Sequence, residues 1–304
     1  MRLFLFEFAT CGEKIEDRIA VEGLAMFKSA FEGFKNYFEI KGFVRPEFTH
    51  LFPLPADSLD SLENYLEESD AFLIVAPEDD FLLYELTKKG EKYAENLGSS
   101  SKAIAVTSDK WELYKKLKGR VQVPETSLRE LDRRFLVKPR TGCAGEGIRF
   151  SNVVPEGYIA QEFIEGMNLS VSLKVGEDIQ CLSVNEQLLN GFRYAGAIVP
   201  ARVSEEVRRE VAEEAINAVE CVSGLRGYVG VDVVYAEQPY IIEINARLTT
   251  PVVAFSKAYG VSVAELLAGE KVRHVRRQLL RKSERAEKPY VSVGNYAVEL
   301  VDVD

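Results

Sequence analysis

The segment YIIEINAR, residues 240–247, combines an apolar β-strand with a row of polar side chains. In an extended chain alternate side chains share a face, so Glu243, Asn245 and Arg247 should point the same way. Ile242 and the apolar residues between them should point the other way. We therefore expect one face to join the core, while the polar face is either a plain solvent-facing surface or a chemical site.

The strand before this segment predicts a partner for the polar row. We expect a hairpin with a two-residue loop at residues 237–238, which pairs Val234 with Ile241. The same register places Asp232 opposite Glu243. Directly opposed carboxylates destabilise a hairpin by up to about 1 kcal/mol, so this pair predicts a bound cation.

The remaining polar residues narrow the kind of site. Asp232, Glu243 and Asn245 would offer three hard oxygen donors on one face, which suits Mg²⁺ or Mn²⁺. Arg247 extends the row, and its planar guanidinium can hold a phosphate or a carboxylate at two points. From these residues alone, an amphipathic strand without a site stays open as the alternative.

The composition is that of an ordinary globular protein with an acidic balance. Of 304 residues, 46% are hydrophobic and 28% are charged, with 48 acidic against 38 basic residues and a net charge of -10. This balance argues against a nucleic-acid or anionic-membrane surface. No apolar run approaches the roughly 20 residues that span a bilayer, and MRLFLFEFATC has an acidic residue too early for a secretion signal. We expect a cytoplasmic protein.

Cysteine and histidine offer little for catalysis. The four cysteines form no CxxC pair, so reduced structural residues are expected; they are Cys11, Cys143, Cys181 and Cys221. His50 and His274 are the two histidines, and neither stands beside a second catalytic-looking group. A histidine-based triad or metal site is not expected, so the chemistry falls to carboxylates, lysines and the backbone.

The first hundred residues alternate apolar runs with amphipathic stretches. The expected strands are RLFLFEF, THLFPL, AFLIVAP and KAIAVT, and residues 16–38 keep a helical period of 3.6 residues. This alternation predicts a parallel sheet covered by helices on both faces, which is a Rossmann-like half-domain. The first strand is followed by FATCGEK rather than GxGxxG, so a dinucleotide site is not expected.

The alternation of strands and helices ends near Ser108, which we expect to cap a helix that begins at Asp109. Paired short strands follow, and then an amphipathic helix within residues 203–224. We expect a helical region to close the chain, with RRQLLRKSER, residues 276–285, as a solvent-exposed basic helix face. The predicted fold class is α/β followed by α+β.

A glycine-rich turn lies between two expected strands in FLVKPRTGCAGEGIRF, residues 135–150. Lys138 ends the first strand, and Gly142, Gly145 and Gly147 open the turn. Glycines let backbone N–H groups approach phosphate oxygens, and a lysine supplies positive charge. The segment is no GxxxxGK[ST] loop, because a strand rather than a helix follows it. A plain glycine-rich hairpin is the alternative.

The third motif is YIAQEFIEG, residues 158–166, in which an apolar strand breaks at a glycine turn. Glu162 and Glu165 flank Ile164 there. Such a hinge between two units could read the edge of an adenine through its backbone while Ile164 packs on the ring. An amphipathic strand that ends in a turn explains the same residues without a ligand.

In their order and spacing, these motifs resemble the ATP-grasp superfamily. The segment SDKWELYKKL with Lys110 precedes Lys138 with GCAGEG, then QEFIEG, then Asp232 with EINAR. The resemblance implies an ATP-grasp fold with an N-terminal Rossmann-like pre-domain. The implied units are the pre-domain at 1–100, a small lid with the glycine-rich flap at 101–165, and a C-terminal unit with the metal site at 166–304.

The resemblance also implies a role for each motif. Lys110 and Lys138 would contact the ATP phosphates, and Lys138 and Arg247 would serve catalysis at the transferred phosphoryl group. The flap over the phosphates would use Gly142, Gly145 and Gly147. Adenine and ribose would be held by Glu162, Phe163, Ile164 and either Glu165 or Asn168. The divalent cations would be held by Asp232, Glu243 and Asn245. Asn168 stands where family members often carry a glutamate for the ribose hydroxyls.

The segments FEFATCGE, VNEQLLN and YAGAIVP resemble the archaeal branch of ATP-grasp carboligases that includes the tyramine–glutamate ligases of methanofuran biosynthesis. The implied reaction joins the γ-carboxylate of L-glutamate to the amine of tyramine through an acyl phosphate, with release of ADP and phosphate. Glu7 or Glu78 would bind the tyramine ammonium, because both end strands of the predicted open sheet. Arg193 or Arg202 would bind the α-carboxylate of glutamate.

Two alternatives stay open. The same fold could join a different amino acid and amine, because the loops that shape a substrate pocket are not readable from sequence. A regulator that binds ATP without turnover should have lost a metal ligand or a phosphate lysine, and this chain retains them. We therefore expect a small carboxylate and a small amine as partners, with ATP and Mg²⁺ or Mn²⁺, no nucleic acid and no membrane. A homodimer is left open.

Overall fold

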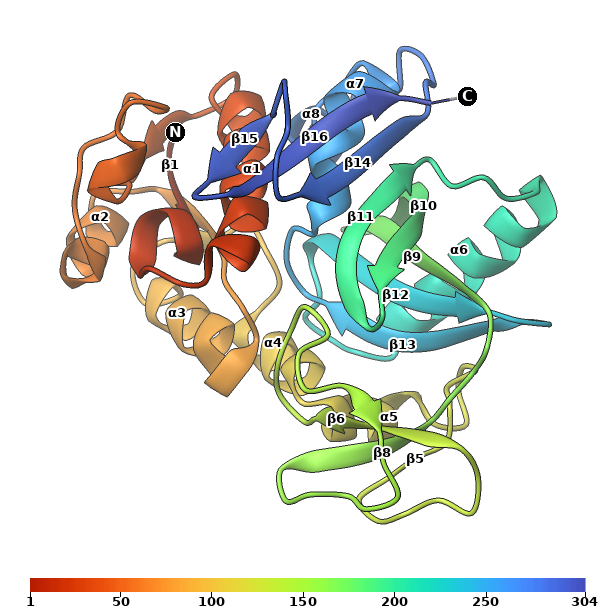
Figure 1. Cartoon of the computed structure of the whole chain (residues 1–304). Coiled ribbons are helices and arrows are strands. Elements are labelled where there is room, and N and C mark those ends of the chain that lie inside the picture. Colours follow the sequence, from red (N-terminus) through yellow and green to blue (C-terminus); the bar gives the residue numbers. More distant parts are fainter. Residues whose placement is uncertain (304) are drawn as a thin grey trace.

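The computed structural model describes residues 1–303, which form three β-sheets in succession along the chain (Figure 1). Helix α1 (Asp17–Phe34), near the N-terminus, contacts strands β15 (Val291–Val293) and β16 (Tyr296–Asp302), near the C-terminus. One large apolar core therefore joins the first and the third sheet. The second sheet has a small core of its own and lies at the bottom of Figure 1.

The N-terminal sheet is parallel, with the strand order β2-β1-β3-β4. Five consecutive residues of β1 are buried, because helices cover both faces of the sheet. The strands are β1 (Arg2–Glu7), β2 (Glu39–Lys41), β3 (Ala71–Val75) and β4 (Glu95–Asn96). The further helices are α2 (Leu62–Glu67) and α3 (Leu82–Gly90), with the short turns η1 (Phe8–Gly12), η2 (Pro46–Phe48), η3 (Leu59–Ser61) and η4 (Asp79–Phe81).

Two of the four strands predicted for this unit are wrong. THLFPL, residues 49–54, forms turns, and β2 lies earlier in the chain. KAIAVT lies in helix α4 (Ser101–Ser108). The Ser100 side chain accepts a hydrogen bond from Ala103 N and so caps this helix. A short apolar run fits either element, and here the cap decides for the helix.

The second sheet has the strand order β5-β8-β6-β7. Its strands are β5 (Thr126–Ser127), β6 (Phe135–Pro139), β7 (Arg149–Phe150) and β8 (Tyr158–Glu162). Helix α5 (Lys110–Leu117) precedes it. The N-cap of α5 is Asp109, whose carboxylate accepts two backbone N–H groups of the first turn, whereas the predicted cap Ser108 is the last residue of α4.

The third sheet is antiparallel, with the strand order β13-β12-β9-β10-β11-β14-β16-β15. Its further strands are β9 (Met167–Val175), β10 (Ile179–Asn190), β11 (Arg193–Val199), β12 (Gly227–Tyr235), β13 (Pro239–Asn245) and β14 (Gln278–Ser283). The predicted amphipathic helix is α6 (Glu205–Glu220), which packs on this sheet and is capped by the Ser204 side chain. Between β13 and β14 lie η5 (Thr250–Ala254), α7 (Phe255–Tyr259) and α8 (Val263–Ala268).

The predicted basic helix at residues 276–285 is wrong, because this segment forms β14 between β11 and β16. Gln278 and Leu280 are fully buried and the Lys282 side chain is 8% exposed, whereas Arg281 is exposed. This alternation has a period of two, which is that of a strand with one buried face. The predicted helical end of the chain is therefore wrong beyond α8, since three strands close it.

The β12–β13 hairpin has a different loop from the one predicted. The loop has three residues, 236–238, so Val233 rather than Val234 is the partner of Ile241. A β-bulge at Ile242 follows and absorbs the extra residue. The extra loop residue and the bulged residue offset each other. Beyond the bulge Asp232 therefore pairs with Glu243, as predicted.

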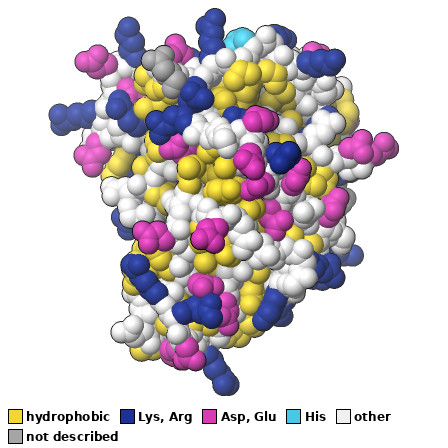
Figure 2. Space-filling model, turned by 90° about the vertical axis from the view of Figure 1, so that its right-hand side faces the viewer, with side chains coloured by type: hydrophobic (Ala, Val, Ile, Leu, Met, Phe, Trp, Pro, Cys, Tyr) yellow, Lys and Arg dark blue, Asp and Glu magenta, His cyan; other side chains and the backbone are white. Residues whose placement is uncertain are grey.

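The face shown in Figure 2 carries acidic and basic side chains interspersed, with apolar side chains between them. The acidic excess of the chain is thus not gathered into one field on this face. Within residues 1–303 there is no helix with the length and apolar character needed to cross a membrane.

Candidate active site

A cavity of about 280 Å³ lies between the three sheets, with walls from η1, α1, β6, β8 and the strands β9 to β13. Ten predicted residues line it: Lys138, Gly145, Glu162, Phe163, Ile164, Asn168, Asp232, Glu243, Asn245 and Arg247. Four predicted residues lie outside this lining: Lys110, Gly142, Gly147 and Glu165. The three sequence motifs therefore share one cavity.

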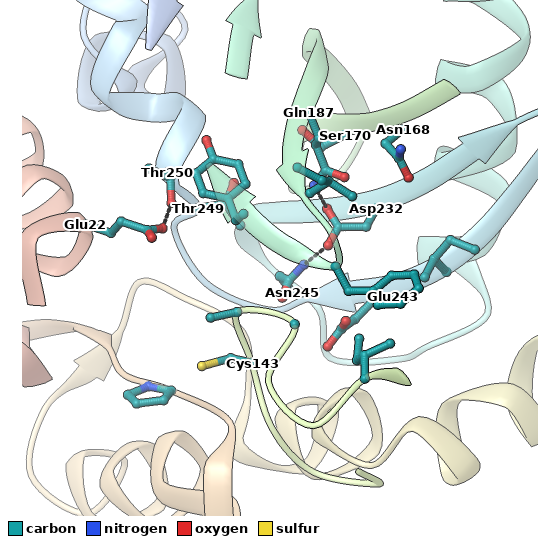
Figure 3. A pocket seen from close by; sticks show the side chains of 18 of the residues that line it. Glu22, Cys143, Asn168, Ser170, Gln187, Asp232, Glu243, Asn245, Thr249 and Thr250 are labelled. Atoms are coloured by element: carbon teal, nitrogen blue, oxygen red, sulfur yellow. Dashed lines mark hydrogen bonds between the residues drawn. The ribbon is translucent and has the colours of Figure 1, made fainter. Parts of the chain in front are cut away.

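The polar row of β13 forms one side of this cavity (Figure 3). Asp232 lies opposite Glu243 in the ladder. Because of the bulge, Ile242 and Glu243 both line the cavity, so the prediction that Ile242 points away from the polar row is wrong. Asn245 Nδ2 donates to one Asp232 oxygen at 3.2 Å, and Gln187 Nε2 donates to the other at 2.8 Å.

The electrostatics of this row favour a bound cation. Burial raises the pKa of Asp232 to about 7, and the negative charge of Glu243 adds to the rise. The hydrogen bonds from Asn245 and Gln187 act in the opposite direction but do not cancel it. The ionised form of Asp232 is therefore disfavoured in this cavity, and a positive charge nearby would favour it.

Two buried lysines face these carboxylates. Lys110 Nζ lies 3.2 Å from Glu243 Oε1 and donates to the carbonyl of Gly142 at 2.8 Å. Burial alone would lower the pKa of Lys110, but Glu243 outweighs it and the pKa is raised. At Lys138, burial lowers the pKa to about 8, and Lys110 adds to the fall. An anion in the cavity would stabilise the charged form of Lys138.

The flap, residues 142–147, is closed over the cavity. Glu146 forms an ion pair with Arg18 of α1, with 2.6 Å between Oε1 and Nη2. Gly145 has a φ of 75°, and a Cβ there would lie 1.9 Å from the carbonyl oxygen of Phe192 in the β10–β11 turn. The flap therefore contacts the N-terminal unit and the large sheet at once.

Gly145→Ala should hold the flap away from this position. We expect the rate of ADP release to fall roughly tenfold or more, since misplacement by about 1 Å is enough for such losses. The control is Gly157→Ala, which has a similar φ of 79° but nothing within 4 Å of the added Cβ. Equal rates for the two variants would mean that the closed flap is not the working state.

The Glu162 carboxylate and the N–H group of Phe163 in the hinge are engaged within the protein. The Glu162 carboxylate accepts from Arg133 Nη1 at 2.9 Å and from the N–H of Glu125 at 3.2 Å. The N–H of Phe163 donates to the carbonyl of Arg134 at 3.0 Å. These groups already have partners in the protein, so contact with a ligand falls to the remaining backbone and the apolar side chains.

Arg247 is held from the N-terminal unit. Its Nε and Nη2 donate to the two oxygens of Glu78 at 2.7 and 2.8 Å, and its Nη1 donates to the carbonyl of Leu248 at 3.2 Å. The two side chains are 12% and 5% exposed. A guanidinium has five N–H donors, so two remain for a ligand. Glu78 lies outside the cavity lining and holds Arg247 with both of its oxygens, which argues against the expectation that it binds an ammonium.

The arginines predicted to bind a carboxylate lie outside the cavity lining. Arg202 forms a two-point ion pair with Glu186, at 2.8 and 3.0 Å. Arg193 is exposed at the start of β11, and Tyr194, the next residue, lines the cavity instead. Alternation along a strand sends neighbouring side chains to opposite faces, and this phase was not readable from the sequence. The structure thus places neither arginine at the cavity, which argues against this prediction.

The end of the cavity near α1 carries polar residues that sequence analysis missed. Glu22 accepts from Thr250 Oγ1 at 3.1 Å and forms an ion pair with Lys282 of β14. The Tyr194 hydroxyl is buried beside Thr250, and its pKa is raised by burial and by Glu22. No local signal marks these residues, because each occupies an ordinary position of its own element.

Glu7 also lines the cavity, but it has a structural task. Its carboxylate accepts from the N–H groups of Ala9 and Thr10 at 3.0 and 2.9 Å and from Thr10 Oγ1 at 2.7 Å. Burial raises the pKa of Glu7. These bonds hold the η1 turn and use much of the acceptor capacity of Glu7.

Comparisons with known proteins agree with this geometry. A family model described as an ATP-grasp domain matches residues 107–251, and one described as a pre ATP-grasp 3 domain matches residues 45–104. A tyramine--L-glutamate ligase from Methanocaldococcus fervens is 35% identical over 285 residues, covering 87% of this chain and 92% of the relative. The chain belongs to the ATP-grasp family. A ligase of the same name from Methanocaldococcus jannaschii is 36% identical over 280 residues and 87% of each chain.

Solved structures confirm the ATP-grasp fold. An ATP-grasp superfamily protein from Archaeoglobus fulgidus superposes with a TM-score of 0.98 at 75% identity over 100% of both chains. An L-amino acid ligase from Bacillus licheniformis superposes with a TM-score of 0.67 at 16% identity, over 95% of this chain and 81% of that one. The second likeness shows the fold alone.

ATP-grasp ligases use ATP and divalent cations, and the donor set of this cavity fits such a cation. No group of three or more His, Cys, Asp or Glu side chains in residues 1–303 is arranged to hold a metal. Asp232 and Glu243 instead supply two opposed carboxylates, and Asn245 adds an amide oxygen. Mg²⁺ is commonly bound by one or two carboxylates together with phosphate and water oxygens. Burial and the charge of Glu243 raise the pKa of Asp232, so a bound cation would stabilise its ionised form.

Proposed function

We propose that this protein is an ATP-dependent ligase that joins the γ-carboxylate of L-glutamate to the amine of tyramine, with release of ADP and phosphate. The observation that carries the proposal is the meeting of Lys138, Arg247 and the Asp232–Glu243 pair in one cavity under a glycine-rich flap. The choice of substrates is supported by the names of the two relatives, of which this chain covers 92% and 87%.

The nucleotide would lie between the second sheet and the large sheet. Phe163 and Ile164 would pack on adenine, and the flap would cover the phosphates. Asn168 is the better candidate for the ribose, because it lines the cavity whereas Glu165 is exposed outside it. Lys138 would bind a phosphate oxygen and regain its full charge in doing so.

The reaction needs no nucleophile from the protein. A carboxylate oxygen of the substrate attacks the γ-phosphorus of ATP, the bond to the β–γ bridging oxygen breaks, and ADP leaves. The neutral amine then attacks the acyl carbon, phosphate leaves with the C–O electron pair, and the amine loses one proton. Positioning and charge stabilisation dominate phosphoryl transfer, which agrees with the absence of both histidines from the cavity lining.

The chain's own residues orient these groups. Arg247 has two free N–H donors and is fixed by Glu78, so it would hold the transferred phosphoryl group at a set angle. Lys110 binds both Glu243 and the carbonyl of Gly142, so it would hold the flap at a fixed position relative to Glu243. A divalent cation, Mg²⁺ or Mn²⁺, bound to Asp232, Glu243 and Asn245 would supply charge neutralisation next to the phosphates.

The test is a screen for ADP release by purified protein with ATP, Mg²⁺ or Mn²⁺, and amino acids and amines in pairs. We expect L-glutamate with tyramine to give ADP faster than other pairs, together with a γ-linked amide. Turnover with another amine and none with tyramine would discard the substrates and keep the ligase. Failure to bind ATP in the presence of either cation would discard the ligase as well.

A further inference from the structure

Three oxygen-bearing side chains gather at the end of the cavity near α1. Glu22, Thr250 and Tyr194 come from α1, η5 and β11, and all three line the cavity. Figure 3 shows Glu22 and Thr250 joined by a hydrogen bond, on the opposite side of the view from Asp232. The nucleotide and metal sites described above use none of these three residues.

The charge of this cluster defines what it can bind. Glu22 has one hydrogen bond from Thr250 and an ion pair with Lys282, which does not line the cavity. A carboxylate accepts about four hydrogen bonds, so Glu22 retains acceptor positions on the cavity side. An anionic ligand would be repelled by Glu22, whereas a cation would be attracted.

Tyr194 provides a second and independent sign of a ligand. Its hydroxyl is buried at the cavity end, and within residues 1–303 it makes no hydrogen bond of normal geometry, although Thr250 lies close enough to lower its pKa. A buried polar group without a partner is costly and uncommon in a native protein. A ligand that bonds to this hydroxyl would remove the cost.

The number of acceptors matches an ammonium group. A primary ammonium has three N–H donors and no acceptor. The Glu22 carboxylate, the Tyr194 hydroxyl and the Thr250 hydroxyl can each accept one of these donors, since Thr250 spends its own proton on Glu22. Three charge-assisted hydrogen bonds to one ammonium would bind it firmly.

The chemistry of the reaction decides which ammonium this is. The amine that attacks an acyl phosphate must be neutral, and acceptors around an ammonium stabilise its protonated form. An ammonium bound by Glu22 is therefore unable to act as the nucleophile. We propose that Glu22, Tyr194 and Thr250 form the subsite for the α-ammonium of the carboxylate substrate. The inference rests on the proposed ligase function, and it restricts the acid to an α-amino acid.

The decisive comparison is between L-glutamate and glutarate, which has the same reacting carboxylate but no ammonium. Hydroxylamine serves as a small neutral nucleophile that captures the acyl phosphate without using the tyramine site. Whether tyramine or hydroxylamine is the nucleophile, Glu22→Gln should raise the KM for L-glutamate roughly tenfold or more. This is the value of a hydrogen bond to a charged group. The KM values for glutarate and for tyramine should stay within about twofold of the parent.

The matched control is Glu13→Gln, which makes the same charge change at an exposed position just before α1. It should leave the ratio of kcat/KM for L-glutamate and glutarate at its parent value. A role of Glu22 in folding alone would lower the melting temperature and both rates without changing this ratio, and that result would overturn the proposal.

Tyr194→Phe is the second variant, because Glu22→Gln leaves Lys282 buried without its partner and could fail to fold. It removes one oxygen and should raise the KM for L-glutamate by roughly tenfold or more, the value of a hydrogen bond to a charged group, with glutarate unaffected. An unchanged preference for L-glutamate in Tyr194→Phe, or a KM increase for tyramine alone in Glu22→Gln, would overturn the subsite and leave the ligase standing.

The failure of the proposed substrates is distinguishable from the failure of the subsite. If another amino acid proves to be the substrate, it is compared with its analogue without the amino group, and the same loss of preference is expected in both variants. If the parent protein uses a carboxylic acid without an ammonium as well as any amino acid, the subsite is overturned.

Discussion

Asp232→Asn is expected to stop turnover and at the same time to stabilise the metal-free protein. Loss of charge stabilisation at the phosphates should lower the rate of ADP release roughly a hundredfold or more. In the metal-free fold, however, Asp232 is an ionised carboxylate that burial and Glu243 disfavour. One pKa unit corresponds to 1.36 kcal/mol, and with screening by cavity water we expect the variant to gain about 1–2 kcal/mol at pH 8.

The pH dependence gives the sign of this effect. The pKa of Asp232 is about 7 in the folded state and 3.8 in the unfolded chain. Between these values the folded state binds more protons, so the stability of the parent protein falls as pH rises from about 4 to 7. Asp232→Asn should lack this fall, and Mg²⁺ with ADP should stabilise the parent but not the variant.

Melting temperatures of parent and variant at pH 5 and pH 8, without metal, test this directly. Asp178→Asn, an exposed carboxylate in the β9–β10 turn, is the control and should change neither activity nor the pH profile. An Asp232→Asn protein with activity within about threefold of the parent, a barrier change under 1 kcal/mol, would show that the Asp232–Glu243 pair is no metal site.

Glu78→Gln is expected to be the most destabilising single change at the site. It keeps the shape of the side chain but leaves the Arg247 guanidinium buried without a counter-charge. Breaking a buried ion pair by removing one partner costs about 3–5 kcal/mol. Urea unfolding should show this loss, and the rate of ADP release should fall by roughly tenfold or more, because Arg247 is no longer oriented.

Glu95→Gln is the matched control for this prediction. The ion pair of Glu95 with Arg226 also joins the N-terminal unit to the large sheet, but the two side chains are 57% and 54% exposed. An exposed pair contributes roughly 0–1 kcal/mol. Similar losses of stability in the two variants would contradict the view that Glu78 acts as the buried support of Arg247.

The pairing of Asp232 with Glu243 shows how a correct prediction can rest on incomplete geometry. The sequence predicted a two-residue loop, whereas the structure has three loop residues and one bulged residue, Ile242. Loop length and bulges depend on how β12 and β13 pack against the lid and the sheet, and neither follows from local propensity. The two carboxylates meet because the deviations cancel.

The segment at residues 276–285 shows the opposite case. Its basic residues were interpreted as a solvent-exposed helix face, but Lys282 is buried in β14 and neutralises Glu22 of α1. A short segment rich in charged residues has no strong hydrophobic period. Pairing with β11 and β16 therefore determines that it forms a strand. The ion partner of Lys282 lies 260 residues away in the chain.

The sequence by itself determined the ATP-grasp family, and it predicted the residues that we propose for the nucleotide and the cation. These features lie in short continuous segments, where the spacing of a lysine, three glycines or a row such as EINAR is set by covalent connection. Only the tertiary structure decided that Glu78 supports Arg247, that Tyr194 rather than Arg193 faces the cavity, and that Glu22 meets Thr250. These contacts join residues from separate elements. Their energies depend on burial and on which side chains of each strand or helix face the cavity, and a short stretch of sequence specifies neither.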